Sequence, residues 1–148
     1  MNMDNIILLD IDGVLINSCH WKKDEIHEDG YSDFNSECVK NFNAIVEKTG
    51  YDIVLISSRR ISVDIEIMNK YFKNRGVNSE IKHYMPDYNV EGKRWLTRRE
   101  ELEMFLEEYK PNNYLIIDDD KSLLDAGEEI KSRWIQTDSM IGLKNYVI

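Results

Sequence analysis

The chain has 148 residues, of which 42% are hydrophobic and 32% are charged, and its formal net charge is −9. This length is typical of one compact domain with a single core, so we expect residues 1–148 to form one domain. The acidic balance disfavours a protein that binds long nucleic-acid duplexes over a wide surface, although a few local cations can still recognise one phosphate.

The sequence shows no sign of a membrane segment. No apolar run approaches the ~18 residues that a membrane-spanning helix needs, and the first residues do not resemble a signal peptide. We therefore expect a cytoplasmic protein. Cys19 and Cys38 lack metal-binding or CxxC spacing, which favours free thiols in a reducing compartment, with one disulfide as the alternative.

The first third of the chain predicts a strand, a loop, a helix and a second strand. The apolar run at residues 6–9 is typical of a strand that is buried on both faces. Residues 13–34 are polar and predict a loop or small flap. Apolar residues at helical spacing predict a helix over 35–49, which ends at Gly50. The run DIVLIS at 52–57 predicts a second buried strand.

The middle of the chain predicts two more helices around a short strand. Apolar residues from Ile61 to Phe72 recur at helical spacing, and residues 80–84 predict a third strand. After a loop over 85–96, the sequence Thr97-Arg-Arg-Glu100 matches a capping box and predicts a third helix.

The last third of the chain continues the alternation of strands and helices. Residues 114–117 predict a fourth strand, 123–126 a short helix and 133–137 a fifth strand. Strands that alternate with helices pair in parallel through right-handed crossovers. We therefore expect an α/β fold, a Rossmann-like three-layer sandwich with a mostly parallel five-stranded sheet and no cap domain.

Polar side chains follow three of the predicted strands. In open parallel sheets, functional groups gather beyond the carboxyl ends of the strands, so these residues are expected to meet at one edge. They are Asp10 and Asp12 after the first strand, Ser57, Ser58 and Arg59 after the second, and Asp118 and Asp119 after the fourth.

This set of side chains suggests phosphoryl chemistry. Clustered carboxylates repel one another, and their oxygens suit a hard cation such as Mg²⁺. No histidine or cysteine stands beside the strand-end acids, which disfavours zinc. A carboxylate can also attack phosphorus as a nucleophile, and the transferred phosphoryl group then needs hydroxyl and cationic partners.

Three motifs carry a family resemblance. LLDIDGV, LISSR and LIIDDD, in this order and each at the end of a predicted strand, resemble the motifs of the haloacid dehalogenase-like (HAD) phosphohydrolase superfamily. The short chain, with SSR, RREEL and QTDSMIGL, more narrowly resembles the capless HAD domains of RNA-repair proteins and polynucleotide phosphatases. One departure is Val14, where many members have threonine, but it removes no carboxylate.

The resemblance implies a role for each strand-end acid. Asp10 is expected to be the nucleophile, and Asp12 the general acid and base. An ordinary Asp pKa is about 3.9, so the pKa of Asp12 would have to rise, and Asp10 held ionised by Mg²⁺ is a predicted cause. The metal is expected on the Asp10 carboxylate, the Asp12 main-chain carbonyl and Asp118, with Asp119 as a further ligand or supporting group.

The resemblance also implies a set of groups that hold the phosphate and substrate. Ser57 is expected to bind a phosphoryl oxygen, and Arg59, Gly13 and Ser58 to contact the substrate. One basic residue should complete the site, and the candidates are Lys93, Arg94, Arg98 and Arg99. We favour Arg98, because it stands in the first turn of a predicted helix, where a cation is unfavourable by ~0.3–1 kcal/mol without a specific role.

Simpler structural roles compete with these assignments. Asp-Gly favours turns, and a serine after a strand can cap a helix; of the two serines, Ser58 is the expected cap. Arg98 and Arg59 can be ordinary surface charges. Trp21 and Trp95 stand beside basic residues and could stack on a nucleobase, but packing against the protein is the favoured alternative.

The leading functional hypothesis is an Mg²⁺-dependent phosphomonoesterase that forms an aspartyl-phosphate and acts on the terminal phosphate of a DNA or RNA end. The absence of a cap domain predicts an open site that suits such a bulky substrate. One alternative is a phosphatase of small metabolites or nucleotides. The other is a module that binds phosphate or metal without turnover. The sequence makes no prediction about the oligomeric state.

Overall fold

The computed structural model describes residues 3–17 and 24–146. Cys19 and Trp21 lie outside the described residues, as does part of the predicted flap. The described chain forms one five-stranded sheet with the strand order β3-β2-β1-β4-β5. All four strand pairs are parallel, so the expected mostly parallel sheet is entirely parallel. The strands are β1 (Asn5–Leu9), β2 (Asp52–Leu55), β3 (Ile81–Tyr84), β4 (Asn113–Asp118) and β5 (Trp134–Gln136).

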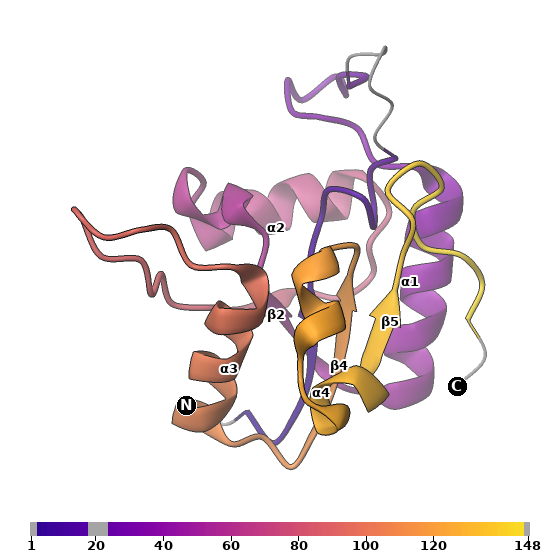
Figure 1. Ribbon diagram of the computed structural model, residues 1–148. Coiled ribbons are helices and arrows are strands. Elements are labelled where there is room, and N and C mark those ends of the chain that lie inside the picture. Colours follow the sequence, from indigo (N-terminus) through magenta and orange to yellow (C-terminus); the bar gives the residue numbers. More distant parts are fainter. Residues whose placement is uncertain (1–2, 18–23, 147–148) are drawn as a thin grey trace.

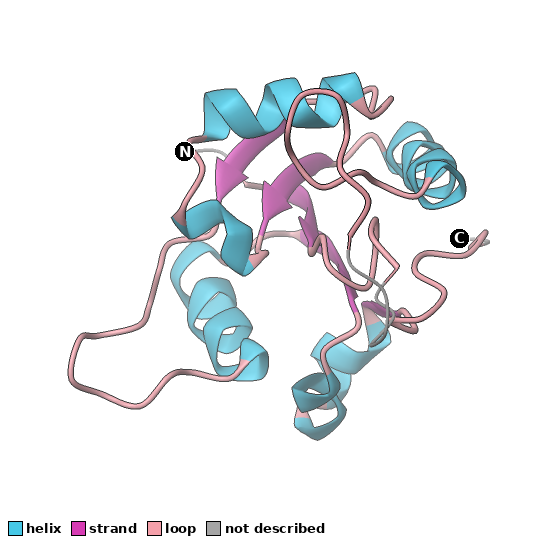
Figure 2. Cartoon of the chain, turned by 90° about the horizontal axis from the view of Figure 1, so that it is seen from above, coloured by secondary structure: helices cyan, strands magenta, loops and turns pink. Residues whose placement is uncertain are grey.

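Helices cover both faces of the sheet, which gives the predicted three layers (Figures 1 and 2). One face carries α1 and α2, and the other carries α3, η2 and α4, as the two hydrophobic clusters show. The α-helices are α1 (Ser36–Thr49), α2 (Ile65–Asn74), α3 (Arg98–Tyr109) and α4 (Glu128–Ser132), and the 3₁₀ helices are η1 (Ser58–Ile61) and η2 (Lys121–Asp125).

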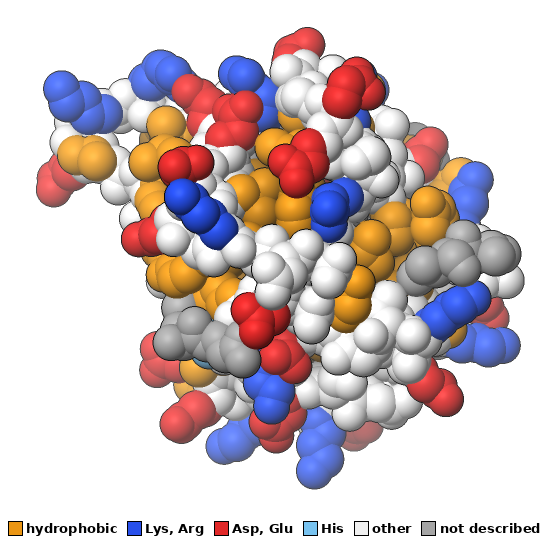
Figure 3. All heavy atoms as spheres, turned by 90° about the horizontal axis from the view of Figure 1, so that it is seen from below, with side chains coloured by type: hydrophobic (Ala, Val, Ile, Leu, Met, Phe, Trp, Pro, Cys, Tyr) orange, Lys and Arg blue, Asp and Glu red, His pale blue; other side chains and the backbone are white. Residues whose placement is uncertain are grey.

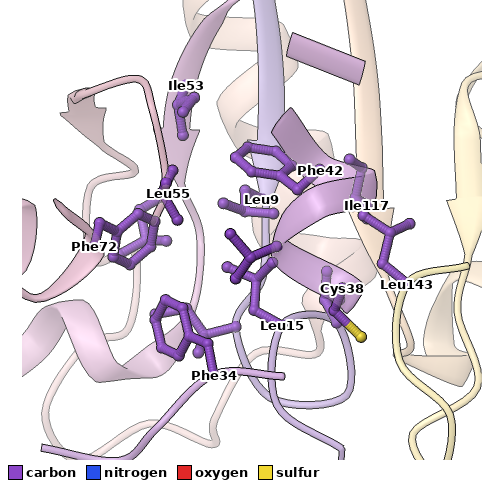
Figure 4. Packing of buried hydrophobic residues seen from close by; sticks show 14 of the residues in the cluster. Leu9, Leu15, Phe34, Cys38, Phe42, Ile53, Leu55, Phe72, Ile117 and Leu143 are labelled. Carbon is purple, nitrogen blue, oxygen red and sulfur yellow. The ribbon is translucent and has the colours of Figure 1, made fainter. Parts of the chain in front are cut away.

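The central strand β1 explains the apolar run in the sequence. Successive side chains of a strand point to opposite faces. Ile7 and Leu9 pack in one cluster with α1 and α2, where Phe42 and Phe72 are buried (Figure 4). Ile6 and Leu8 belong to the other cluster, with residues of α3. Because both faces are covered, the four residues of β1 from Ile6 to Leu9 are all buried and all apolar.

The predicted helix boundaries follow the capping residues. Asn35 accepts hydrogen bonds from the main-chain N–H groups of Glu37 and Cys38 at the start of α1, and Gly50 ends that helix with φ +67°. Thr97 and Glu100 form the predicted capping box at the start of α3. These side chains satisfy N–H groups that have no partner within the helix, which is why the sequence marks these ends clearly.

One predicted helix begins later than expected, and one helix was not predicted. The second helix begins at Ile65, after Asp64, whereas Ile61 belongs to η1 and is 60% exposed. Its apolar side chain matched the helical spacing without being part of the core. The helix α4 was not predicted, because its five residues include none that is buried and therefore show no apolar periodicity.

The second described part of the flap, residues 24–34, is held against α2. The Arg75 guanidinium donates hydrogen bonds to both oxygens of Asp29, at 2.6 and 2.7 Å. These bonds hold the pKa of the Asp29 carboxyl well below its usual range. The Tyr31 ring stacks on Tyr71 with 4.3 Å between the ring centroids. The flap therefore has a fixed position beside the carboxyl end of the sheet.

No helix among the described residues is long and apolar enough to cross a membrane. The face of the molecule seen from below, at the amino ends of the strands, has basic and acidic side chains interspersed around its rim (Figure 3). The opposite end of the sheet carries the polar residues that the sequence singled out.

Candidate active site

The ends of β1 and β4 bring three carboxylates together. These strands are neighbours in the sheet, with Leu9 opposite Ile117, so the residues that follow them meet at one edge. Asp10, Asp118 and Asp119 each offer one oxygen, and these oxygens all lie within 4.8 Å of one another. Asp118 is completely buried and Asp10 is 6% exposed. The strand order reverses between β1 and β4, and such a switch point is the usual place for a ligand site in open parallel sheets.

Gly13 allows Asp119 to approach the turn after β1. Gly13 has φ +79°, and a Cβ atom at this position would overlap the Asp119 carboxylate. Its carbonyl oxygen accepts a hydrogen bond of 2.7 Å from the Thr137 hydroxyl, which links the turn to the segment after β5. The structure thus gives Gly13 a steric and conformational role beside the acids.

We expect Gly13→Ala to lower the free energy of unfolding by about 3 kcal/mol or more, since it combines an unfavourable φ with a clash. It should also weaken any stabilisation by Mg²⁺, because Asp119 would be displaced. Urea denaturation with and without Mg²⁺ measures both effects. Gly30→Ala is the matched control: Gly30 has φ +87° but no atom within 4 Å of its Cβ position, so it reports backbone strain alone. Equal losses in the two variants would contradict the steric role of Gly13.

Arg98 is the basic residue that reaches the acids. Its guanidinium nitrogens lie 3.4 Å from Asp118 Oδ2 and 3.9 Å from Asp10 Oδ1, and Nη1 donates to the Ile56 carbonyl at 3.0 Å. Burial opposes the charge of Arg98, but Asp118 and Asp10 outweigh it and raise the pKa of the guanidinium. Arg98 is therefore a fixed cation beside the candidate nucleophile.

The other basic candidates lie elsewhere. Arg94 is 71% exposed in its side chain and pairs with Glu100, and Arg99 lies 3.8 Å from Glu103 along the helix. Lys93 is exposed on the loop before α3. Of the four candidates from the sequence, the structure brings only Arg98 to the carboxylates.

The acidic cluster has the properties of a cation site. Burial raises the pKa of Asp10, and burial together with repulsion from Asp10 raises the pKa of Asp118 well above its usual range. Asp118 Oδ2 accepts no hydrogen bond from any described residue. Arg98 lies 3.4 Å from this oxygen without a hydrogen bond to it, and one arginine offsets only one of the three clustered carboxylates, so a further cation would stabilise the cluster. The three ligands are all carboxylates, so the residues present fit a hard ion such as Mg²⁺.

Asp12 lies apart from this cluster and pairs with Arg59. The Arg59 guanidinium donates two hydrogen bonds of 2.8 Å to the two oxygens of Asp12, and this pairing raises the pKa of Arg59. The same arginine reaches Asp24 and Ser32 of the flap, at 3.2 and 3.3 Å. Both oxygens of Asp12 are engaged by Arg59, so a proton-donating role requires this pair to open.

Ser57, and not Ser58, is the residue that caps the helix after β2. Ser57 is 1% exposed and caps η1, because its Oγ accepts a hydrogen bond of 3.2 Å from the Arg59 main-chain N–H. The prediction that Ser58 is the cap was wrong, and Ser58 is exposed. A hydroxyl can accept and donate at once, so the Ser57 proton remains available for a phosphoryl oxygen.

A second buried ion pair beside the site was not predicted. Arg60 is 7% exposed, and its guanidinium donates to the carbonyl oxygens of Met85 and Ile56 at 2.7 and 2.9 Å. Its Nη2 lies 3.4 Å from Glu101 Oε2, and Glu101 Oε1 lies 3.7 Å from Arg98 Nε. Glu101 stands one turn after Arg98 on α3, a spacing that could have suggested this contact.

Comparison with known proteins gives one match that covers nearly the whole chain. Residues 6–147 match a family model described as the HAD domain in Swiss Army Knife RNA repair proteins. A search of curated proteins finds no match to this chain.

Proposed function

Because the chain belongs to the family of HAD domains found in Swiss Army Knife RNA repair proteins, we propose that it is an Mg²⁺-dependent phosphomonoesterase that removes a terminal phosphate from a nucleic acid. The observation that carries this proposal is the buried Asp10 carboxylate, which lies beside Asp118 and Asp119 and within 3.9 Å of the Arg98 guanidinium. A nucleophile, a cation site and a fixed positive charge thus occupy one sheet edge.

In the first step, an oxygen of Asp10 attacks the phosphorus atom. A new P–O bond forms to Asp10, and the ester P–O bond to the nucleoside oxygen breaks. Asp12, separated from Arg59 and protonated, gives its proton to the leaving oxygen. Ser57 donates a hydrogen bond to a phosphoryl oxygen, and Arg98 offsets the negative charge that spreads over the phosphoryl group.

In the second step, water attacks the phosphorus of the aspartyl-phosphate. Asp12, now ionised, accepts the proton of the water, and the P–O bond to Asp10 breaks, so that inorganic phosphate leaves and Asp10 is restored. Asp10, Asp118 and Asp119 are the residues that would hold Mg²⁺, together with the Asp12 main-chain carbonyl. When bound, the ion would neutralise the carboxylates and polarise the phosphoryl oxygens.

Arg59 has two proposed tasks in this scheme. It orients Asp12 through both carboxylate oxygens before substrate binds, and it can turn to the negative substrate when the pair opens. The flap residues Asp24 and Ser32 also contact Arg59, at 3.2 and 3.3 Å, so the flap would help to set its position.

A panel of substrates tests the proposal. Release of inorganic phosphate is measured with and without Mg²⁺ for oligonucleotides that carry 3′- or 5′-phosphates, for nucleoside monophosphates and for sugar phosphates. We expect Mg²⁺-dependent release with the highest kcat/KM for one kind of oligonucleotide end. The net charge of −9 favours the alternative of a free-nucleotide substrate, and a higher kcat/KM for mononucleotides would replace the end-processing proposal by that one. No release from any substrate would support a module without turnover.

A further inference from the structure

A pocket of about 360 Å³ opens beside the acidic cluster and shares Arg98 with it. Its walls come from η1, from the loop between β3 and α3, from the start of α3 and from the residues after β4. The volume lies in the lower part of the range that small-molecule sites occupy, about 300–1,000 Å³. Because Arg98 also approaches Asp10, a ligand in this pocket would lie next to the scissile phosphate.

The rim of the pocket is apolar and exposed. Trp95 is 78% exposed and Ile61 is 60% exposed, although both are large apolar side chains. Both line the pocket, together with Leu96. A flat indole that stands in solvent at the mouth of a pocket offers a face for stacking, and every nucleobase has a matching face.

The loop that carries Trp95 is held in place by its own polar contacts. The Asn89 side chain accepts a hydrogen bond of 2.8 Å from the Leu96 main-chain N–H. Tyr88 donates to Glu108 at 2.6 Å, and Arg94 bonds to Glu100 at 2.7 and 2.8 Å. The loop projects from the body of the molecule, at the left of Figures 1 and 2. Trp95 is thus presented by a loop that is pinned at several points.

The charges of the pocket favour a neutral ligand with hydrogen-bond donors over a second phosphate. Three acids line it, Asp87, Glu101 and Asp120, against two arginines, Arg60 and Arg98. Arg60 and Arg98 are already engaged by main-chain carbonyls and by Glu101. Carboxylate oxygens at the wall can accept from the amino groups and ring N–H groups of a base.

We propose that this pocket binds the nucleobase of the nucleotide that carries the scissile phosphate, with the base stacked on the Trp95 indole and its polar edge toward Asp87 and Asp120. The inference rests on the proposed function and adds the place where the substrate's base is recognised. It makes the base, and not only the phosphate, a source of affinity, and it gives the loop over 85–97 a role in substrate selection.

Binding to an Asp10→Asn variant tests the pocket without turnover. Nucleoside 3′- and 5′-monophosphates and ribose 5-phosphate are titrated, and binding is followed by chemical shifts of the indole N–H groups and by calorimetry. We expect Trp95→Ala in this background to raise the Kd for a nucleotide about tenfold, the effect of losing one stacked base. The Kd for ribose 5-phosphate, which has no base, should stay unchanged, and Trp95→Phe should restore most of the affinity.

Val90→Ala is the matched control, because Val90 lies on the same loop and is 62% exposed but does not line the pocket. An equal Kd for the nucleotide in the Trp95→Ala and Val90→Ala variants would overturn the assignment, and so would a loss of ribose 5-phosphate binding equal to the loss of nucleotide binding. Nucleotide binding that depends on Trp95 in a protein without phosphatase activity would support the pocket and refute the proposed function, so the two failures are distinct.

Discussion

Replacement of Asp10 by asparagine is expected to abolish phosphate release. The amide cannot form the aspartyl-phosphate, so kcat should fall by at least about 10³-fold, as it does when a nucleophile is removed from other enzymes. Asp10 is 6% exposed and its side chain keeps its volume in the variant, so the fold should be retained. Initial rates with the best substrate of the panel measure the loss of kcat, and the circular dichroism spectrum shows whether the fold is retained.

Asp125→Asn is a suitable control for this variant. It makes the same chemical change at an exposed position of η2, and it should keep the wild-type rate. Phosphate release by Asp10→Asn within a factor of two of the control would remove Asp10 from the reaction. A covalent phosphate on Asp10, trapped by rapid acid quench and detected by mass spectrometry in the wild type, would support the intermediate.

The second large effect concerns how the stability of the metal-free protein depends on pH. The pKa of Asp118 in the folded state is raised well above its usual value by burial and by Asp10. Between the ordinary pKa and the raised one, the folded state therefore holds a proton that the unfolded state has lost. The free energy of unfolding should then fall as pH rises from about 4 toward neutral.

Asp118→Asn should remove much of this pH dependence. The neutral amide needs no proton, so at pH 7 without metal the variant should be more stable than the wild type by about 1 kcal/mol, or about 3 °C in melting temperature. Other carboxylates act in the opposite direction, since the pKa of Glu100 is lowered to about 2 by Arg94. The difference between the wild type and the variant isolates Asp118. A difference that is constant from pH 4 to pH 8 in EDTA would contradict the raised pKa of Asp118.

The fold could be predicted because the burial of each core strand and the starts of α1 and α3 leave a recognisable residue pattern in the sequence. Strands covered on both faces are apolar at every position, as residues 6–9 and 114–117 are, and the caps Asn35 and Thr97 mark helix starts. Ile61 was assigned to a helix because apolar spacing does not distinguish a core residue from one that lines a pocket. The helix α4 leaves no such pattern, since none of its residues is buried.

The meeting of the strand-end carboxylates could be predicted from the topology of the sheet. The pairing of Asp12 with Arg59 could not. Parallel strands deliver their carboxyl ends to one edge, which predicts the meeting of Asp10 and Asp118 from strand positions alone. Arg98 could be chosen because the capping box fixed its place at the start of α3. The pairing of Asp12 with Arg59 depends instead on how the η1 turn and the flap are oriented, which no local pattern specifies.

The pocket lined by Trp95 could not be predicted either, because it depends on contacts between segments that are distant in the sequence. Its lining residues come from four separate segments of the chain, and the loop over 85–97 has its shape from contacts such as that of Asn89 with Leu96. The sequence marked Trp95 only as an aromatic residue beside basic ones, and packing against the protein was the favoured interpretation. That interpretation was wrong, because the side chain is 78% exposed.

The most direct measurement is a titration of the wild type and of Asp118→Asn with Mg²⁺, followed by thermal or urea denaturation at pH 7. The three carboxylates within 4.8 Å of one another predict a bound cation. At a hundredfold excess over the Kd, Mg²⁺ should therefore raise the free energy of unfolding of the wild type by about 2.7 kcal/mol. Asp118→Asn should gain little, and Asp125→Asn should gain as much as the wild type. Equal stabilisation of all three proteins, or none of the wild type, would contradict a metal site at this edge of the sheet.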